Sequence, residues 1–118
     1  MTVHHAALET HPRDGAALVA FFELLGFDQV EPPEGLRGRA LWLERSGTQV
    51  HLLLIDDPVA PPQGHVAVVA PADYDDTLAR LRAAGHEVSE REQYWGSPRS
   101  FASAPGGHRV EVMERPPS

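Results

Sequence analysis

The chain has 118 residues, 42% of them hydrophobic and 23% charged, which suits one compact globular domain and is too short for two ordinary ones. Its net charge of -7 and the scatter of its ten basic residues argue against binding to a nucleic-acid backbone. No apolar run could span a membrane, no signal sequence opens the chain, and no cysteine offers disulfide or thiolate chemistry. We therefore expect a protein of the reducing cytoplasm without nucleic-acid or membrane partners.

The first half of the chain predicts one helix and four strands. The opening strand is expected at Val3–Glu9, and the helix runs from Asp14 to Leu25, with Asp14 as its N-cap and Gly26 as the glycine that follows its last turn. The loop EPPEG and the tight turn SGT separate three further strands. These strands are predicted at Phe27–Glu31, Arg39–Arg45 and Gln49–Ile55.

A Pro-rich stretch at residues 57–63 reads as a linker, and after it the same order of elements returns. A strand at HVAVVA precedes a helix with Asp73 as N-cap and Gly85 after its last turn. Three strands then follow, at His86–Arg91, Pro98–Ser103 and His108–Glu114. The chain therefore predicts two β-α-β-β-β modules, residues 1–56 and 64–114, within one domain of α+β class.

The two modules also match at chemically informative positions when one is shifted by 60 residues. First-strand residue His5 then falls on His65, and fourth-strand residue His51 falls on Glu111. Gly47 falls on Gly107 in the turn before the fourth strand, while Gly26 and Gly85 differ by 59. Two of these matches pair ionisable residues inside apolar strands, which favours a shared site over chance.

His51 is conspicuous because it lies among apolar residues of the strand Gln49–Ile55. A buried imidazole costs free energy unless it has a partner, and for His51 alone an ordinary hydrogen-bonded core histidine is the simpler interpretation. Strand alternation, however, places His51 and Glu111 on matching faces. If the modules pair around a pseudo-twofold axis, these two side chains can converge with His5 and His65. Imidazole and carboxylate are ligands for Zn, Ni, Mn, Fe or Co, so the four residues predict a divalent metal site.

The repeated plan resembles the vicinal oxygen chelate superfamily, which includes glyoxalase I, fosfomycin-resistance enzymes, extradiol dioxygenases, methylmalonyl-CoA epimerase and bleomycin-binding proteins. The resemblance covers almost the whole chain, through the stretches VHHAAL, FFELLGF, GHVAVV, LRAAGHEV and GGHRVEVME. It implies curved mixed sheets around a cleft, with helices on the outside. Such half-open sheets leave apolar faces and edges uncovered, so we expect a twofold homodimer that covers them and completes two identical sites. The resemblance also implies that His5, His65 and Glu111 match the metal ligands of the fosfomycin-enzyme type.

Three stretches depart from the family pattern. His51 stands where glyoxalase I offers a glutamate, so it is expected either as a fourth metal ligand or as a base. The usual Asp-Pro-Asp-Gly turn before the last strand is Ala-Pro-Gly-Gly here, and QYWGSPRSF does not reproduce the cation-binding loop of the fosfomycin enzymes. The resemblance therefore identifies the superfamily without selecting one of its enzymes.

Four residues are predicted to contact a small-molecule substrate. Tyr94 and Trp95 form an aromatic loop that could cover an apolar group, with ordinary loop packing as the alternative. Arg99 and Arg109 could hold an anionic group, although for either one singly a surface salt bridge is the simpler use. With Glu111 and His51 as proton-transfer residues, the chain is expected to be a metal-dependent lyase, isomerase or transferase acting on vicinal oxygens. The alternative is a bleomycin-resistance type of binding protein, which sequesters a small molecule without catalysis.

Overall fold

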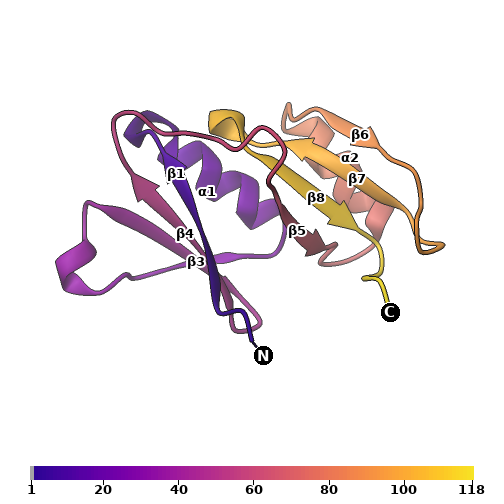
Figure 1. Cartoon of the computed structure of the whole chain (residues 1–118), viewed down its shortest axis with the longest axis horizontal. Coiled ribbons are helices and arrows are strands. Elements are labelled where there is room, and N and C mark those ends of the chain that lie inside the picture. Colours follow the sequence, from indigo (N-terminus) through magenta and orange to yellow (C-terminus); the bar gives the residue numbers. More distant parts are fainter. Residues whose placement is uncertain (1) are drawn as a thin grey trace. The chain divides into compact units, whose positions relative to one another are not determined.

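The computed structural model describes residues 2–118 and divides the chain into two compact units, the first ending at Ala60 and the second starting at Pro61. Each unit contains one α-helix and one four-stranded sheet (Figure 1). The predicted α+β class and the repeated β-α-β-β-β order are confirmed. No helix within residues 2–118 combines the length and the apolar character needed to cross a bilayer.

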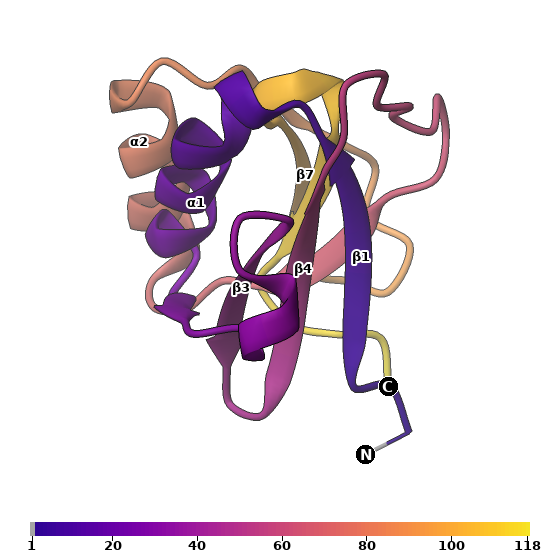
Figure 2. The same ribbon diagram turned by 90° about the vertical axis from the view of Figure 1, so that its left-hand side faces the viewer.

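The first unit pairs its strands in the order β1-β4-β3-β2. Strands β1 and β4 are parallel, whereas β4 with β3 and β3 with β2 are antiparallel. Figure 2 shows α1 lying along one face of this sheet. The elements are β1 (His5–Thr10), α1 (Gly15–Leu24), β2 (Asp28–Val30), β3 (Ala40–Arg45) and β4 (Thr48–Leu54), with short 3-10 turns at Pro12–Asp14 and Glu34–Leu36.

The second unit repeats this topology as β5-β8-β7-β6, again with the first and fourth strands parallel and the others antiparallel. Its elements are β5 (Val66–Val69), α2 (Tyr74–Ala83), β6 (Val88–Glu90), β7 (Arg99–Ser103) and β8 (Arg109–Met113), with a 3-10 turn at Pro105–Gly107. In both units the boundaries lie within two residues of the predicted ones.

The ends of the two helices show which local signals act as expected. The carboxylate of Asp73 caps α2 by accepting from the amide of Asp76 at 2.9 Å, whereas Asp14 occupies the N-cap position of α1 without a side-chain cap. Gly26 and Gly85 follow the two helices with φ angles of 88° and 95°. Because this left-handed conformation strains residues with a Cβ atom, glycine is the residue that ends each helix cleanly.

In the fourth strand of each unit, successive side chains point alternately into the core and toward the opposite face of the sheet. In β4, Val50 and Leu52 are buried in the core of their unit, and in β8 Val110 and Val112 are fully buried. A Cβ atom on Gly15 of α1 would lie 3.0 Å from a methyl of Leu41, so the helix packs closely on this face of the sheet. The residues between these apolar positions, among them His51, point from the opposite face.

Candidate functional site

The strand registers preserve the 60-residue correspondence. His5 lies two residues before Ala7, which pairs with His51 across β1 and β4. His65 lies two residues before Ala67, which pairs with Glu111 across β5 and β8. Each unit therefore presents a histidine from the start of its first strand and an ionisable residue from the middle of its fourth strand. The four predicted metal ligands form two equivalent pairs.

In the first unit the pair is part of a stack of three rings. The imidazole of His51 lies 4.0 Å from the indole of Trp42, with an interplanar angle of 3°, and 4.0 Å from the imidazole of His5, with an angle of 20°. His51 is 7% exposed, whereas the His5 ring at the outer end of the stack is exposed. From its place in the apolar strand ALWLE, Trp42 would be expected between sheet and helix; that expectation is wrong, because its register pairing with His51 places both on the other face.

Two residues of the same sheet fix the tautomer of His51. The amide nitrogen of Gln49 donates to a carboxylate oxygen of Glu44 at 2.9 Å, which turns the amide oxygen of Gln49 toward His51. That oxygen lies 2.7 Å from Nε2 of His51 and can only accept, so Nε2 carries the hydrogen. In the neutral ring Nδ1 then keeps its lone pair.

The surroundings of His51 also favour that neutral form. Burial lowers the pKa of His51 below its usual value of 6.5, and nearby His5 and His4 lower it further. His4 precedes β1, with its ring 6.4 Å from that of His51 and its Nδ1 3.1 Å from Nδ1 of His5. An uncharged imidazole with a free lone pair suits both metal binding and proton transfer.

In the second unit a carboxylate and an imidazole point at each other. Nε2 of His65 lies 3.1 Å from Oε1 of Glu111, and Nδ1 of His65 lies 3.0 Å from the carbonyl oxygen of Gln63. The carbonyl can only accept, so Nδ1 carries a hydrogen. In a neutral His65 the Nε2 lone pair would therefore face the carboxylate, and a positive charge, either a proton or a metal ion, has to lie between the two atoms.

The other oxygen of Glu111 contacts an arginine. Nη1 of Arg99 lies 3.4 Å from Oε2 of Glu111, and Nε of Arg99 donates to the carbonyl of Glu92 at 2.8 Å. The guanidinium also lies 4.9 Å from the centre of the Tyr94 ring and 6.0 Å from the Trp95 ring. Three of the four predicted substrate-binding residues therefore gather beside Glu111.

The fourth of these residues, Arg109, contacts Phe101, which the sequence analysis did not predict as a site residue. Its guanidinium lies 4.2 Å from the centre of the Phe101 ring, which Arg91 and Arg99 also contact at 5.4 and 5.7 Å. Phe101 pairs with Glu111 in the register of β7 and β8, as Trp42 pairs with His51 in the first unit. Because side chains alternate between the two faces of a strand, Phe101 lies on the same face as Arg99. That spacing in the sequence could have revealed it as a site residue.

No set of three or more His, Asp or Glu side chains within residues 2–118 is grouped so that it could hold a metal ion. Each unit by itself brings together two of the four predicted ligands, His5 with His51 and His65 with Glu111. The prediction that all four converge on one point stays a prediction.

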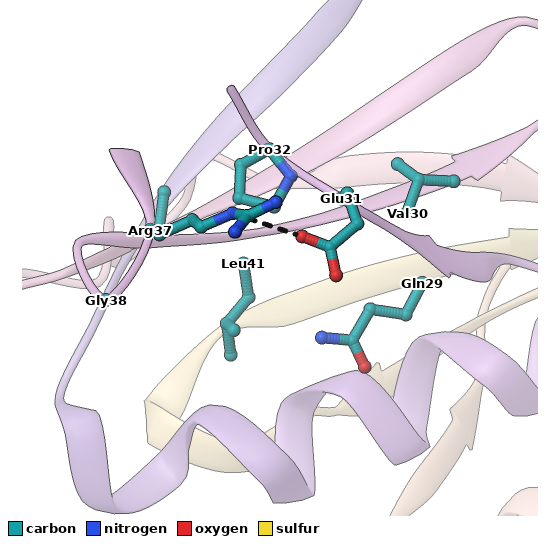
Figure 3. A pocket seen from close by; sticks show the side chains of 8 residues that line it. Gln29, Val30, Glu31, Pro32, Arg37, Gly38 and Leu41 are labelled. Atoms are coloured by element: carbon teal, nitrogen blue, oxygen red, sulfur yellow. Dashed lines mark ion pairs between the residues drawn. The ribbon is translucent and has the colours of Figure 1, made fainter. Parts of the chain in front are cut away.

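The first unit also has an open hollow of about 470 Å³ at the edge of its sheet (Figure 3). It is lined by the segment that follows β2 and by Leu41 of β3, and an exposed ion pair between Arg37 and Glu31 lies at its rim, 3.5 Å between Nε and Oε2. Its lining residues do not include Trp42, His51 or His5, so the hollow is not part of the ring stack.

Comparisons with known proteins agree with this architecture. The family model described as the Glyoxalase/Bleomycin resistance protein/Dioxygenase superfamily matches residues 2–112. A solved structure from Bacillus anthracis assigned to the glyoxalase family has a TM-score of 0.86 at 22% identity, covering 98% of this chain and 96% of its own. Lactoylglutathione lyase from Agrobacterium tumefaciens has a TM-score of 0.72 at 22% identity, with 95% and 92% covered. Oxidase ChaP-H1 has 0.74 at 20% identity, with 98% and 97% covered. The search of curated proteins gave no significant match.

Proposed function

The chain belongs to the Glyoxalase/Bleomycin resistance protein/Dioxygenase superfamily, and on that premise we propose that it is a divalent-metal-dependent enzyme acting on a small substrate with two vicinal oxygens. The reaction would be of the lyase, isomerase or transferase type. The ligands would be His5, His65 and Glu111, and His51 would serve as the base.

The observation that carries this proposal is the arrangement of His65 and Glu111. Two ligand atoms bound to one ion at about 2.0 to 2.2 Å, with an angle of 90° to 110°, lie about 2.8 to 3.6 Å apart. Nε2 of His65 and Oε1 of Glu111 are 3.1 Å apart. The hydrogen bond between Nδ1 of His65 and the carbonyl of Gln63 orients the ring, as an outer partner does for metal-bound histidines. The residues present therefore fit a divalent cation.

Stacking distinguishes the roles of the two histidines of the first unit. Imidazole lone pairs lie in the ring plane, so two rings stacked at 20° direct them along nearly parallel planes and do not converge on one ion. His5 is exposed and can turn toward a ligand position. His51 is stacked on Trp42 and bonded to Gln49, so it keeps its orientation. We therefore assign metal binding to His5 and proton transfer to His51.

The chemistry then divides among the chain's own groups. A divalent ion bound by these ligands would act as a Lewis acid that polarises two adjacent substrate oxygens. Nδ1 of His51, uncharged and with its lone pair free, would accept a proton from the substrate. Arg99 would orient an anionic substrate group, helped by Arg109, while Tyr94 and Trp95 would shield an apolar part from water.

A complete site requires that a pair from a first unit meets a pair from a second unit. The two units can belong to one chain or to two chains, and a twofold homodimer would form two identical sites at once. We propose such a homodimer, acting in the cytoplasm. The absence of cysteine fits a reducing compartment.

The second candidate function is small-molecule binding without catalysis. It is favoured by the fact that both oxygens of Glu111 already contact protein groups, Oε1 with His65 and Oε2 with Arg99. If His65 is protonated, a salt bridge satisfies the pair, and the aromatic side chains of Tyr94 and Trp95 would line a binding site for an apolar compound.

Elemental analysis of protein purified without chelator or nickel resin separates the two functions. The comparison uses wild type, Glu111→Gln, His65→Gln and the control Glu114→Gln, whose carboxylate is exposed beyond the end of β8. A metalloenzyme would keep a near-stoichiometric divalent metal in wild type and Glu114→Gln. Both ligand variants would lose affinity by more than the roughly 10- to 100-fold that loss of an outer partner costs.

Metal-free wild-type protein that also fails to bind added Zn, Ni, Mn, Fe or Co would overturn the metalloenzyme and favour the binding protein. Equal metal content in wild type and both ligand variants would refute the site itself.

A further inference from the structure

Three guanidinium groups surround one phenyl ring on the site face of the second unit. The distances from the guanidinium carbons to the centre of the Phe101 ring are 4.2 Å for Arg109, 5.4 Å for Arg91 and 5.7 Å for Arg99. The strand registers explain this, because Phe101 pairs with Glu111, and Arg109 pairs with Ser103, two residues further along β7. Arg91 donates its amide to the carbonyl of Arg99 at 3.0 Å and so continues the pairing of β6 with β7.

The charges of this cluster do not balance. Arg99 has a carboxylate partner, Glu111, at 3.4 Å. Across residues 2–118 neither Arg91 nor Arg109 forms an ion pair, and Arg109 instead donates to the carbonyl of Pro62 at 3.4 Å. This is unexpected in a chain with 17 acidic residues and a net charge of -7. Two positive charges therefore lie around Phe101 without a carboxylate to neutralise them.

The Phe101 ring positions these guanidinium groups but does not neutralise their positive charge. A guanidinium is attracted to the face of an aromatic ring, which positions Arg109 and Arg91 around Phe101 without adding a negative charge. Arg99 is more rigid, since its side chain is only 12% exposed and its Nε is bonded to the carbonyl of Glu92. The planar N–H groups of arginine match the oxygens of phosphate and carboxylate.

We propose that Arg91, Arg99 and Arg109 form a binding site for a dianionic oxyanion group, of the phosphate or dicarboxylate type. Two uncompensated guanidinium charges match two negative charges. The site shares its sheet face with His65 and Glu111, so the dianion would be part of the substrate. This last step rests on the proposed function, whereas binding of the anion itself does not need the metal.

The test uses metal-free protein, dialysed against a chelator and then against buffer, at constant ionic strength. Inorganic phosphate and malonate are the dianionic probes at pH 8, and acetate is the singly charged control, each titrated by isothermal calorimetry. We expect at least one of the two dianions to bind about tenfold more tightly than acetate, or more. A hydrogen bond to a charged group is typically worth that factor or more. Preference between phosphate and malonate identifies the type of dianion.

Variants connect the binding to the cluster. Arg91→Gln and Arg109→Gln should each weaken binding of the preferred dianion by about tenfold or more, whereas Arg80→Gln should change it less than about twofold. Arg80 is the matched control, because it removes the same charge from the same unit but is ion-paired with Asp76 on α2. If Arg109→Gln fails to fold, Arg109→Lys is measured in its place, because it keeps the charge.

Glu111→Gln separates this proposal from the metal site. The substitution removes the single carboxylate from the cluster, so dianion binding should be kept or tightened while metal binding is lost. Dianions that bind no more tightly than acetate, or binding that Arg91→Gln and Arg109→Gln leave unchanged, would overturn the anion site and leave the metal proposal standing.

Discussion

Replacement of His51 by phenylalanine tests whether this residue is held as a neutral, hydrogen-bonded ring. A phenyl ring can keep the stacking on Trp42 and His5 at 4.0 Å, but it loses the 2.7 Å hydrogen bond to Gln49. A neutral hydrogen bond of this kind contributes about 0.5 to 1.5 kcal/mol to stability. At pH 8, where the wild-type ring is uncharged, His51→Phe should therefore lower the free energy of unfolding by about 1 kcal/mol.

At lower pH the same substitution should cost less. The pKa of His51 is lowered in the folded state by burial and by His5 and His4, whereas in the unfolded chain it lies near 6.5. The unfolded chain therefore binds the proton more readily, and wild-type stability falls as the pH drops below about 6.5. Each unit of difference in pKa is worth about 1.4 kcal/mol. Phenylalanine binds no proton and escapes this loss.

Urea unfolding at pH 8 and pH 5 measures the effect, followed by circular dichroism because the substitution changes the surroundings of Trp42. The destabilisation by His51→Phe should shrink or change sign at pH 5. A cost at pH 5 equal to or larger than that at pH 8 would refute the neutral, hydrogen-bonded description of His51.

The remaining predictions concern stability and assembly. Asp73→Ala should destabilise the protein by about 1 kcal/mol in urea unfolding, because it removes the cap of α2, while Asp14→Ala should cost far less; equal costs would contradict the capping analysis. Tyr74→Phe should cost about 1 to 3 kcal/mol in the same assay, since it leaves the buried hydroxyl of Ser100 without its bond to the Tyr74 hydroxyl, and a neutral effect would argue against that bond. Sedimentation should give about twice the 12.9 kDa chain mass at micromolar concentration, and a monomer would count against the homodimer.

The fold could be predicted because its signals are local. The spacing of Tyr74, Leu78 and Leu81 in the sequence is that of one apolar helix face, and all three residues are buried. Glycines after each helix and alternation in the strands fixed where elements begin and end. The capping of α1 was less predictable, because whether Asp14 reaches a backbone amide depends on its backbone geometry, and here a 3-10 turn ends at that residue.

The candidate site was predictable only in part. His51 and Glu111 stand out because ionisable residues interrupt apolar strands, and the repeat connects them to His5 and His65. The partners that adjust their chemistry carry no such signal. Gln49 looks like an ordinary polar strand residue until its bonds to Glu44 and His51 are known. Likewise, Trp42 looks like a core residue, because sequence does not show which face of a strand the helix covers.

The central claim is that His65 and Glu111 bind the same metal ion. Crystals of protein purified without chelator, measured at the absorption edge of the metal found by elemental analysis, test it most directly. The account predicts an anomalous peak about 2.0 to 2.2 Å from Nε2 of His65 and Oε1 of Glu111, with His5 of the same or a second chain as a further ligand. A peak bound elsewhere, or a His65–Glu111 contact that persists without a peak in crystals soaked with the metal, would contradict it.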